Sequence, residues 1–247
     1  MENELNESTG QNIPFIVGVT LVATLGGLLF GYDTAVISGA EKSVQNYLID
    51  SLGLSTWIHG ATISSALIGC IIGGAISGLI SSSIGRKKAL IIASVLFFIS
   101  ALGSGYPEFL FFNEGEPTVG LLLMFNFYRV IGGIGVGLAS AVCPMYIGEI
   151  APAGIRGRLV SLNQFAIIFG MLVVYFVNYE IASGQTLEWI NNIGWRWMFL
   201  SEAIPAALFG ILLLFVPETP RYLTLVNKNE EALSILAKVN GHINAKK

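Results

Sequence analysis

Residues 119–143 read VGLLLMFNFYRVIGGIGVGLASAVC and carry a single charged side chain, Arg129. A helix needs about 20 mostly apolar residues to cross a hydrocarbon layer about 30 Å thick. This stretch therefore predicts a membrane-spanning helix with one cation inside it.

The same apolar character recurs before and after this stretch. Five further segments are predicted to span: about 13–37, 58–81, 89–105, 159–179 and 197–216. The sequence thus predicts an all-α membrane protein with six transmembrane helices. Its expected division is a cytoplasmic tail at 1–12, a six-span unit at 13–216 and a cytoplasmic linker with a helix at 217–247.

Composition excludes the main soluble classes. The chain of 247 residues is 53% hydrophobic and 12% charged, with a net charge of −3, whereas soluble domains carry about 25% charged residues. That excludes a disordered chain, an ordinary soluble enzyme and a nucleic-acid binder with a basic face. We expect no catalytic residues, no metal site, no cofactor and no nucleic-acid partner.

Basic residues predict the orientation. Lys and Arg favour the cytoplasmic side of a membrane, and most of those in this chain follow the second, fourth and sixth predicted spans. Both termini are therefore expected in the cytoplasm. The residues on that side are Arg86, Lys87, Lys88, Arg156, Arg158, Arg221, Lys228, Lys238, Lys246 and Lys247.

Two ionisable residues lie well inside predicted spans, Asp33 in the first and Arg129 in the fourth. A charge at the centre of a membrane helix costs about 2.5–3.5 kcal/mol on insertion scales, so the two are expected to meet. The pair is either a fixed structural ion pair or a proton site. Glu202, near the outer half of the sixth span, is a third candidate and is interpreted mainly as a helix-packing residue or a loop partner. Gln164 in the fifth span suits either a sugar hydroxyl or a neighbouring backbone group.

Six short motifs, in order along the chain, resemble those of the sugar porter family of the major facilitator superfamily. The resemblance is to the N-terminal half and is strongest to the bacterial D-xylose/proton symporters. The motifs are GGLLFGYD at 26–33, RVIGGIGVG at 129–137, YIGEIAP at 146–152 followed by Arg156-Gly157, NQF at 163–165, GWR at 194–196 and PETPR at 217–221.

The resemblance implies one half of a major facilitator fold, a 3+3 inverted repeat. It implies proton-coupled symport of a monosaccharide, D-xylose or a related sugar, by alternating access in the bacterial inner membrane. The implied partners are the sugar, the proton, the lipid bilayer and a C-terminal half or a second copy. Open alternatives are a sugar uniporter and a truncated half that binds sugar, or is inactive, without transport of its own.

Residue roles follow from the same resemblance. Asp33 and Arg129 are the implied proton-coupling pair, and Phe30 and Gln164 match positions that touch the sugar. The implied cytoplasmic gate consists of Gly85, Arg86, Glu149, Arg156, Glu218 and Arg221.

Two departures from the family pattern stand out. Ser82 and Ser83 occupy the positions of an acid and a base in the loop after the second span, which predicts a weaker gate or a shifted balance of states. The chain also stops after the first half and the start of the central linker, so it is expected to need a second half.

Overall fold

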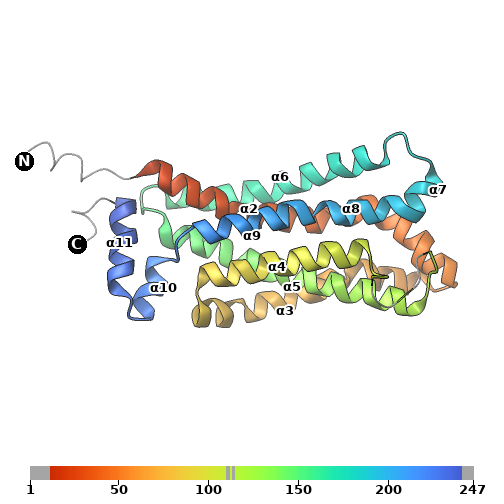
Figure 1. Ribbon diagram of the computed structural model, residues 1–247, viewed down its shortest axis with the longest axis horizontal. Coiled ribbons are helices and arrows are strands. Elements are labelled where there is room, and N and C mark those ends of the chain that lie inside the picture. The colour runs from red at the N-terminus through yellow and green to blue at the C-terminus, as the bar shows by residue number, and fades with distance from the viewer. Residues whose placement is uncertain (1–11, 110–111, 113–114, 241–247) are drawn as a thin grey trace, which may run out of the picture.

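The computed structural model describes residues 12–109, 112 and 115–240, and within these ranges it contains helices and no strands (Figure 1). Residues 1–11 of the predicted tail at 1–12, and residues 241–247 of the predicted linker, lie outside the described residues. The helices are α2 (Ile13–Val44), α3 (Thr56–Ile84), α4 (Arg86–Gly105), α5 (Val119–Ile150), α6 (Arg156–Ala182), α7 (Leu187–Trp189), α8 (Trp195–Ser201), α9 (Ala203–Phe215), α10 (Pro220–Leu225) and α11 (Asn229–Asn240), with short π- or 3-10-helical turns at Gln45–Ile49, Asp50–Leu52 and Ile190–Gly194.

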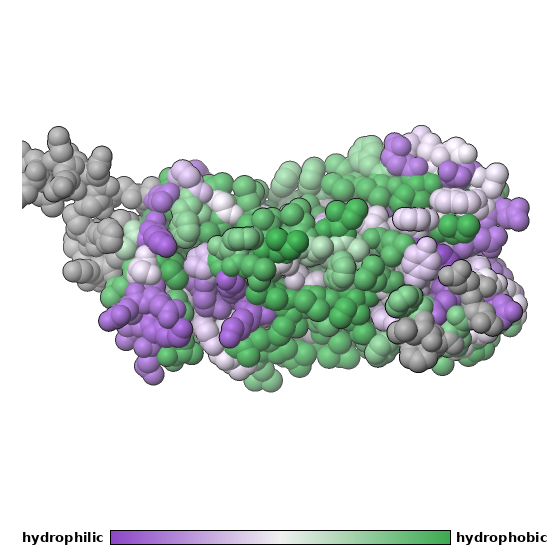
Figure 2. All heavy atoms as spheres, in the orientation of Figure 1, coloured by the Kyte–Doolittle hydropathy of each residue, from purple (hydrophilic) through white to green (hydrophobic). Residues whose placement is uncertain are grey.

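Six helical stretches in the described part of the chain are long and apolar enough to cross a membrane. The first is α2 with the two turns that follow it, and the sixth runs from α7 through α9. Hydrophobic side chains cover the middle of the molecule, and hydrophilic ones gather at its two ends (Figure 2). The prediction of an all-α membrane protein with six spans is confirmed.

The fourth span is longer than predicted. The apolar pattern predicts its end at residue 143, but α5 continues past Pro144 to Ile150. A proline inside a helix removes one backbone hydrogen bond and crowds the preceding turn. Tertiary contacts offset that cost here, because the Tyr146 ring is fully buried and its hydroxyl donates to the carbonyl oxygen of Pro217 at 2.7 Å.

Close backbone contact joins α5 to α3. A Cβ atom at Gly69 would overlap the carbonyl oxygen of Val130, and one at Gly133 would overlap that of Ala66. Small residues at such crossings let membrane helices approach closely. This packing holds Arg129, one turn before Gly133, in a fixed position.

The two ends of the bundle differ. At one end, called the linker end here, α10 and α11 lie across the bundle, and the amide of Asn12 donates to the carbonyl of Val239 at 3.2 Å (Figure 1). The other end, called the α7 end, carries α7 and the turn after α2. The start of α2 and the linker helices are therefore on one side of the bundle.

Candidate functional site

A buried ion pair lies inside the bundle. Nη1 of Arg129, on α5, donates to Oδ1 of Asp33, on α2, at 2.6 Å, and both side chains are 2% exposed. The guanidinium carbon also lies 5.3 Å from the ring centroid of Phe199 on α8. The predicted meeting of Asp33 and Arg129 is therefore confirmed as a contact, and its role stays a prediction.

Glu202 belongs to the same charged cluster. It is fully buried in the turn between α8 and α9, and its electrostatic neighbours are Asp33 and Arg129. No N–H or O–H donor among the described residues reaches its carboxylate oxygens. The structure places Glu202, the third candidate, beside Asp33 and Arg129 and not in a loop, and its role stays a prediction. The sequence does contain a signal for this residue, because an ionisable side chain inside a predicted span is energetically expensive and usually functional.

These three residues form the charged cluster, a polar layer between two apolar cores. One core contains Leu29, Val136 and Ala206, and the other contains Phe125 and Phe199. Along each of these three membrane-spanning stretches, the apolar core residues on one side of the charged position belong to one core, and those on the other side belong to the other core, apart from a single residue next to the charged position of the first stretch. The layer is thus enclosed by apolar side chains on both sides, where water cannot screen its charges.

The two predicted sugar contacts lie on neighbouring helices. Phe30, on α2, is half-buried and packs against the larger core. Gln164, on α6, is exposed. A Cβ atom at Gly31 would overlap the carbonyl oxygen of Ile167, so α2 and α6 are in close backbone contact. Phe30 is one turn before Asp33 on the same helix.

Glu218 caps the start of α4 at the linker end. Its carboxylate accepts from the amides of Arg86 and Lys87, in three contacts of 3.1 Å. Gly85 precedes α4 with φ of +99°, and a Cβ atom there would overlap the Glu218 carboxylate. A negative group at a helix N-terminus is favourable, and glycine is the residue that tolerates this backbone.

Glu149 joins the end of α5 to this cap. Its Oε1 lies 2.9 Å from Nη2 of Arg86, with both side chains buried, and 3.9 Å from Nη1 of Arg221, which is 73% exposed. We call Gly85, Arg86, Glu149, Glu218 and Arg221 the linker clasp. Arg156 is not paired with a carboxylate of the clasp; it donates to the carbonyl of Ala151 at 3.4 Å and closes the end of α5.

Ser82 and Ser83 add no charge to the clasp. Each hydroxyl donates back into α3, to the carbonyls of Leu79 and Ile80 at 3.1 and 3.0 Å. Helix α10 contacts this segment through its backbone, since the hydroxyl of Tyr222 donates to the carbonyl of Ser83 at 3.1 Å.

Residues 19–247 match the family model described as "Sugar (and other) transporter". The chain belongs to the sugar transporter family. It is 54% identical over 245 residues to the D-xylose-proton symporter of Escherichia coli (strain K12), covering 95% of this chain and 50% of that protein. It is 40% identical over 246 residues to the arabinose-proton symporter of Bacillus subtilis (strain 168), covering 100% of this chain and 50% of that protein.

The fold agrees with solved structures of the same family. The major facilitator superfamily proton:xylose symporter XylE, bound to 6-bromo-6-deoxy-D-glucose, matches with a TM-score of 0.91 and 53% identity, over 95% of this chain and 52% of that one. The inward open conformation of the xylose transporter XylE from E. coli matches with a TM-score of 0.87. The chain spans about half the length of the curated relatives it matches. It is an integral multi-pass membrane protein with half of a major facilitator fold.

Proposed function

We propose that this chain is the N-terminal half of a proton-coupled monosaccharide symporter that works by alternating access with a C-terminal half or a second copy. The observation that carries the proposal is the charged cluster, in which one guanidinium is hydrogen-bonded to the buried carboxyl group of Asp33 and lies near that of Glu202. No covalent chemistry is involved, and the protein is not an enzyme.

Charge counting connects the cluster to a proton. With Asp33 and Glu202 both ionised, the cluster holds two negative charges and one positive charge. A buried charge without a partner is expensive. Binding one proton makes the cluster neutral, and it also allows one carboxyl to donate a hydrogen bond to the other. Because the three groups come from different crossings, gain or loss of the proton changes how these crossings are held together.

Phe30 and Gln164 are the proposed sugar contacts. An amide both donates and accepts hydrogen bonds, as sugar hydroxyls do, and an aromatic ring offers an apolar face. The position of Phe30 one turn from Asp33 supports coupling between sugar and proton. The 54% and 40% identical relatives are proton symporters of D-xylose and arabinose, whereas the glucose facilitated diffusion protein of Zymomonas mobilis is 36% identical. Symport of D-xylose or a related monosaccharide is therefore favoured over uniport.

The linker clasp is the proposed cytoplasmic gate. Basic residues concentrate at the linker end, and such residues favour the cytoplasmic side. Both termini then lie in the cytoplasm, and the membrane is the bacterial inner membrane. Two halves of such transporters rock about a site at mid-membrane. Ion pairs such as that of Arg86 and Glu149 form in one state and separate in another, so the clasp would hold the outward-facing state.

The test uses the full protein in proteoliposomes with radiolabelled D-xylose. In Asp33→Asn, accumulation against a sugar gradient should be lost, while exchange of internal for external sugar persists. The matched control is Asp50→Asn, which makes the same change at an exposed position. Accumulation that survives in Asp33→Asn would overturn the proton role of this residue, and wild-type flux that only follows the sugar gradient would indicate a uniporter.

A further inference from the structure

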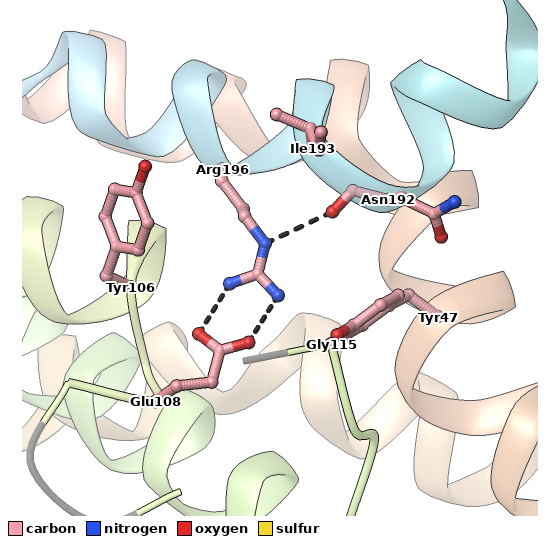
Figure 3. Close-up of a pocket in the computed structure, with 7 residues that line it drawn as sticks. All are labelled: Tyr47, Tyr106, Glu108, Gly115, Asn192, Ile193 and Arg196. Atoms are coloured by element: carbon pink, nitrogen blue, oxygen red, sulfur yellow. Dashed lines mark hydrogen bonds and ion pairs between the residues drawn. The ribbon is translucent and has the colours of Figure 1, made fainter. Parts of the chain in front are cut away.

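A cavity of about 540 Å³ opens at the α7 end (Figure 3). The described residues that line it are Tyr47 after α2, Tyr106, Glu108 and Gly115 after α4, and Asn192, Ile193 and Arg196 around the start of α8. It shares no residue with the charged cluster, the proposed sugar contacts or the linker clasp. Its volume lies within the range of about 300–1,000 Å³ that is typical of small-molecule sites.

A buried ion pair forms one wall of the cavity. The two terminal nitrogens of Arg196 donate hydrogen bonds to the two carboxylate oxygens of Glu108, and both side chains are buried (Figure 3). The Arg196 Nε donates to the carbonyl of Asn192 at 3.2 Å, and the guanidinium carbon lies 4.5 Å and 5.1 Å from the ring centroids of Trp195 and Tyr47. The pair is therefore rigid and electrically balanced before any ligand arrives.

The unpartnered hydroxyl of Tyr47 is the observation that indicates a ligand site. Tyr47 lines the cavity and is only 9% exposed, yet its hydroxyl has no hydrogen-bond partner among the described residues. A buried hydroxyl without a partner is costly, so native structures usually satisfy it. Tyr106 stands on the other side of the ion pair and is partly exposed (Figure 3). The cavity thus has two tyrosine rings, one on either side of an ion pair whose net charge is zero.

We propose that this cavity is a second binding site for a neutral polyhydroxylated molecule, a monosaccharide, at the outer face. Sugar hydroxyls donate and accept, so they satisfy the Tyr47 hydroxyl and the remaining lone pairs of the Glu108 carboxylate together. The tyrosine rings suit the C–H faces of a sugar ring. A charged ligand is disfavoured, because Arg196 and Glu108 already neutralise each other. The ligand class and the outward orientation rest on the proposed function.

The test reads the cavity directly with ¹⁹F NMR. The full protein is labelled with 5-fluorotryptophan in lipid nanodiscs and titrated with D-xylose in a Gln164→Ala background, which weakens the proposed central contact. Trp195 reports on the cavity because its ring lies against Arg196 and 5.7 Å from the Tyr47 ring centroid. Its resonance is assigned by its loss in Trp195→Phe. We expect a saturable shift of this resonance.

Tyr47→Phe keeps the ring and removes only the hydroxyl. It should weaken the apparent affinity about three- to tenfold, as expected for the loss of one hydrogen bond. Tyr179→Phe makes the same change on an exposed residue near the end of α6 and should have no effect. Ile193→Phe is a second variant, which narrows the cavity without touching the ion pair and should also weaken binding.

The proposal is overturned if the Trp195 resonance does not shift saturably, which would mean a cavity filled by water alone. It is equally overturned if Tyr47→Phe and Ile193→Phe bind as tightly as the parent. Failure of the proposed function gives a different result. If Gln164→Ala leaves transport unchanged, the central contact is wrong, while the Trp195 titration still decides whether the cavity binds sugar.

Discussion

Replacing Arg129 by methionine leaves the buried carboxyl groups of Asp33 and Glu202 without the guanidinium beside them. Removing one partner of a buried ion pair costs about 3–5 kcal/mol, because a charge stays behind in a medium that screens it poorly. For a domain of this size, 1 kcal/mol shifts the melting temperature by about 2–4 °C. We therefore expect the melting temperature of Arg129→Met to fall by about 6–20 °C.

The assay is thermal unfolding of the purified full protein in nanodiscs. Arg158→Met is the matched control, since Arg158 is exposed and surface changes are usually within about 0.5 kcal/mol. Adding Asp33→Asn and Glu202→Gln to Arg129→Met removes the stranded charges and should recover most of the loss. A melting temperature for Arg129→Met that matches the control, or a triple variant with no recovery, would refute the energetic account of the charged cluster.

Three further predictions concern packing and the linker clasp. Gly69→Ala should lower the melting temperature because its Cβ would overlap a backbone carbonyl of α5, whereas Gly74→Ala, with open space around it, should not; equal melting temperatures would contradict the close approach of α3 and α5. Glu218→Gln should cost about 0.5–2 kcal/mol of cap energy in the same assay, and a neutral result would count against the cap. Ser82→Asp with Ser83→Arg restores the charges of the family pattern and should shift cysteine-accessibility labelling between the two ends; unchanged labelling would reject the idea of a weakened gate.

The spans and the main ion pair were predictable from the sequence because they depend on local composition. An apolar run of sufficient length crosses a membrane wherever it lies, and a charge inside it needs a partner. Asp33 and Arg129 could therefore be paired from their positions in the chain alone. Their exact roles, like those of Phe30 and Gln164, came from family resemblance and not from geometry.

The parts that sequence reasoning missed depend on contacts between distant segments. Helix α5 passes Pro144 because Tyr146 is anchored by the carbonyl of Pro217. The cavity at the α7 end is built on Glu108 and Arg196, 88 positions apart in the chain. Both residues lie in separate polar connections of the sequence, and no local pattern indicates that they pair.

The most direct test of the central claim is a simultaneous measurement of proton and sugar movement. The full protein is placed in proteoliposomes with a trapped pH-sensitive dye, and D-xylose is added outside with no pre-set proton gradient. We expect proton entry that tracks sugar entry in the wild type and is lost in Asp33→Asn. Sugar entry without any change of internal pH in the wild type would contradict it.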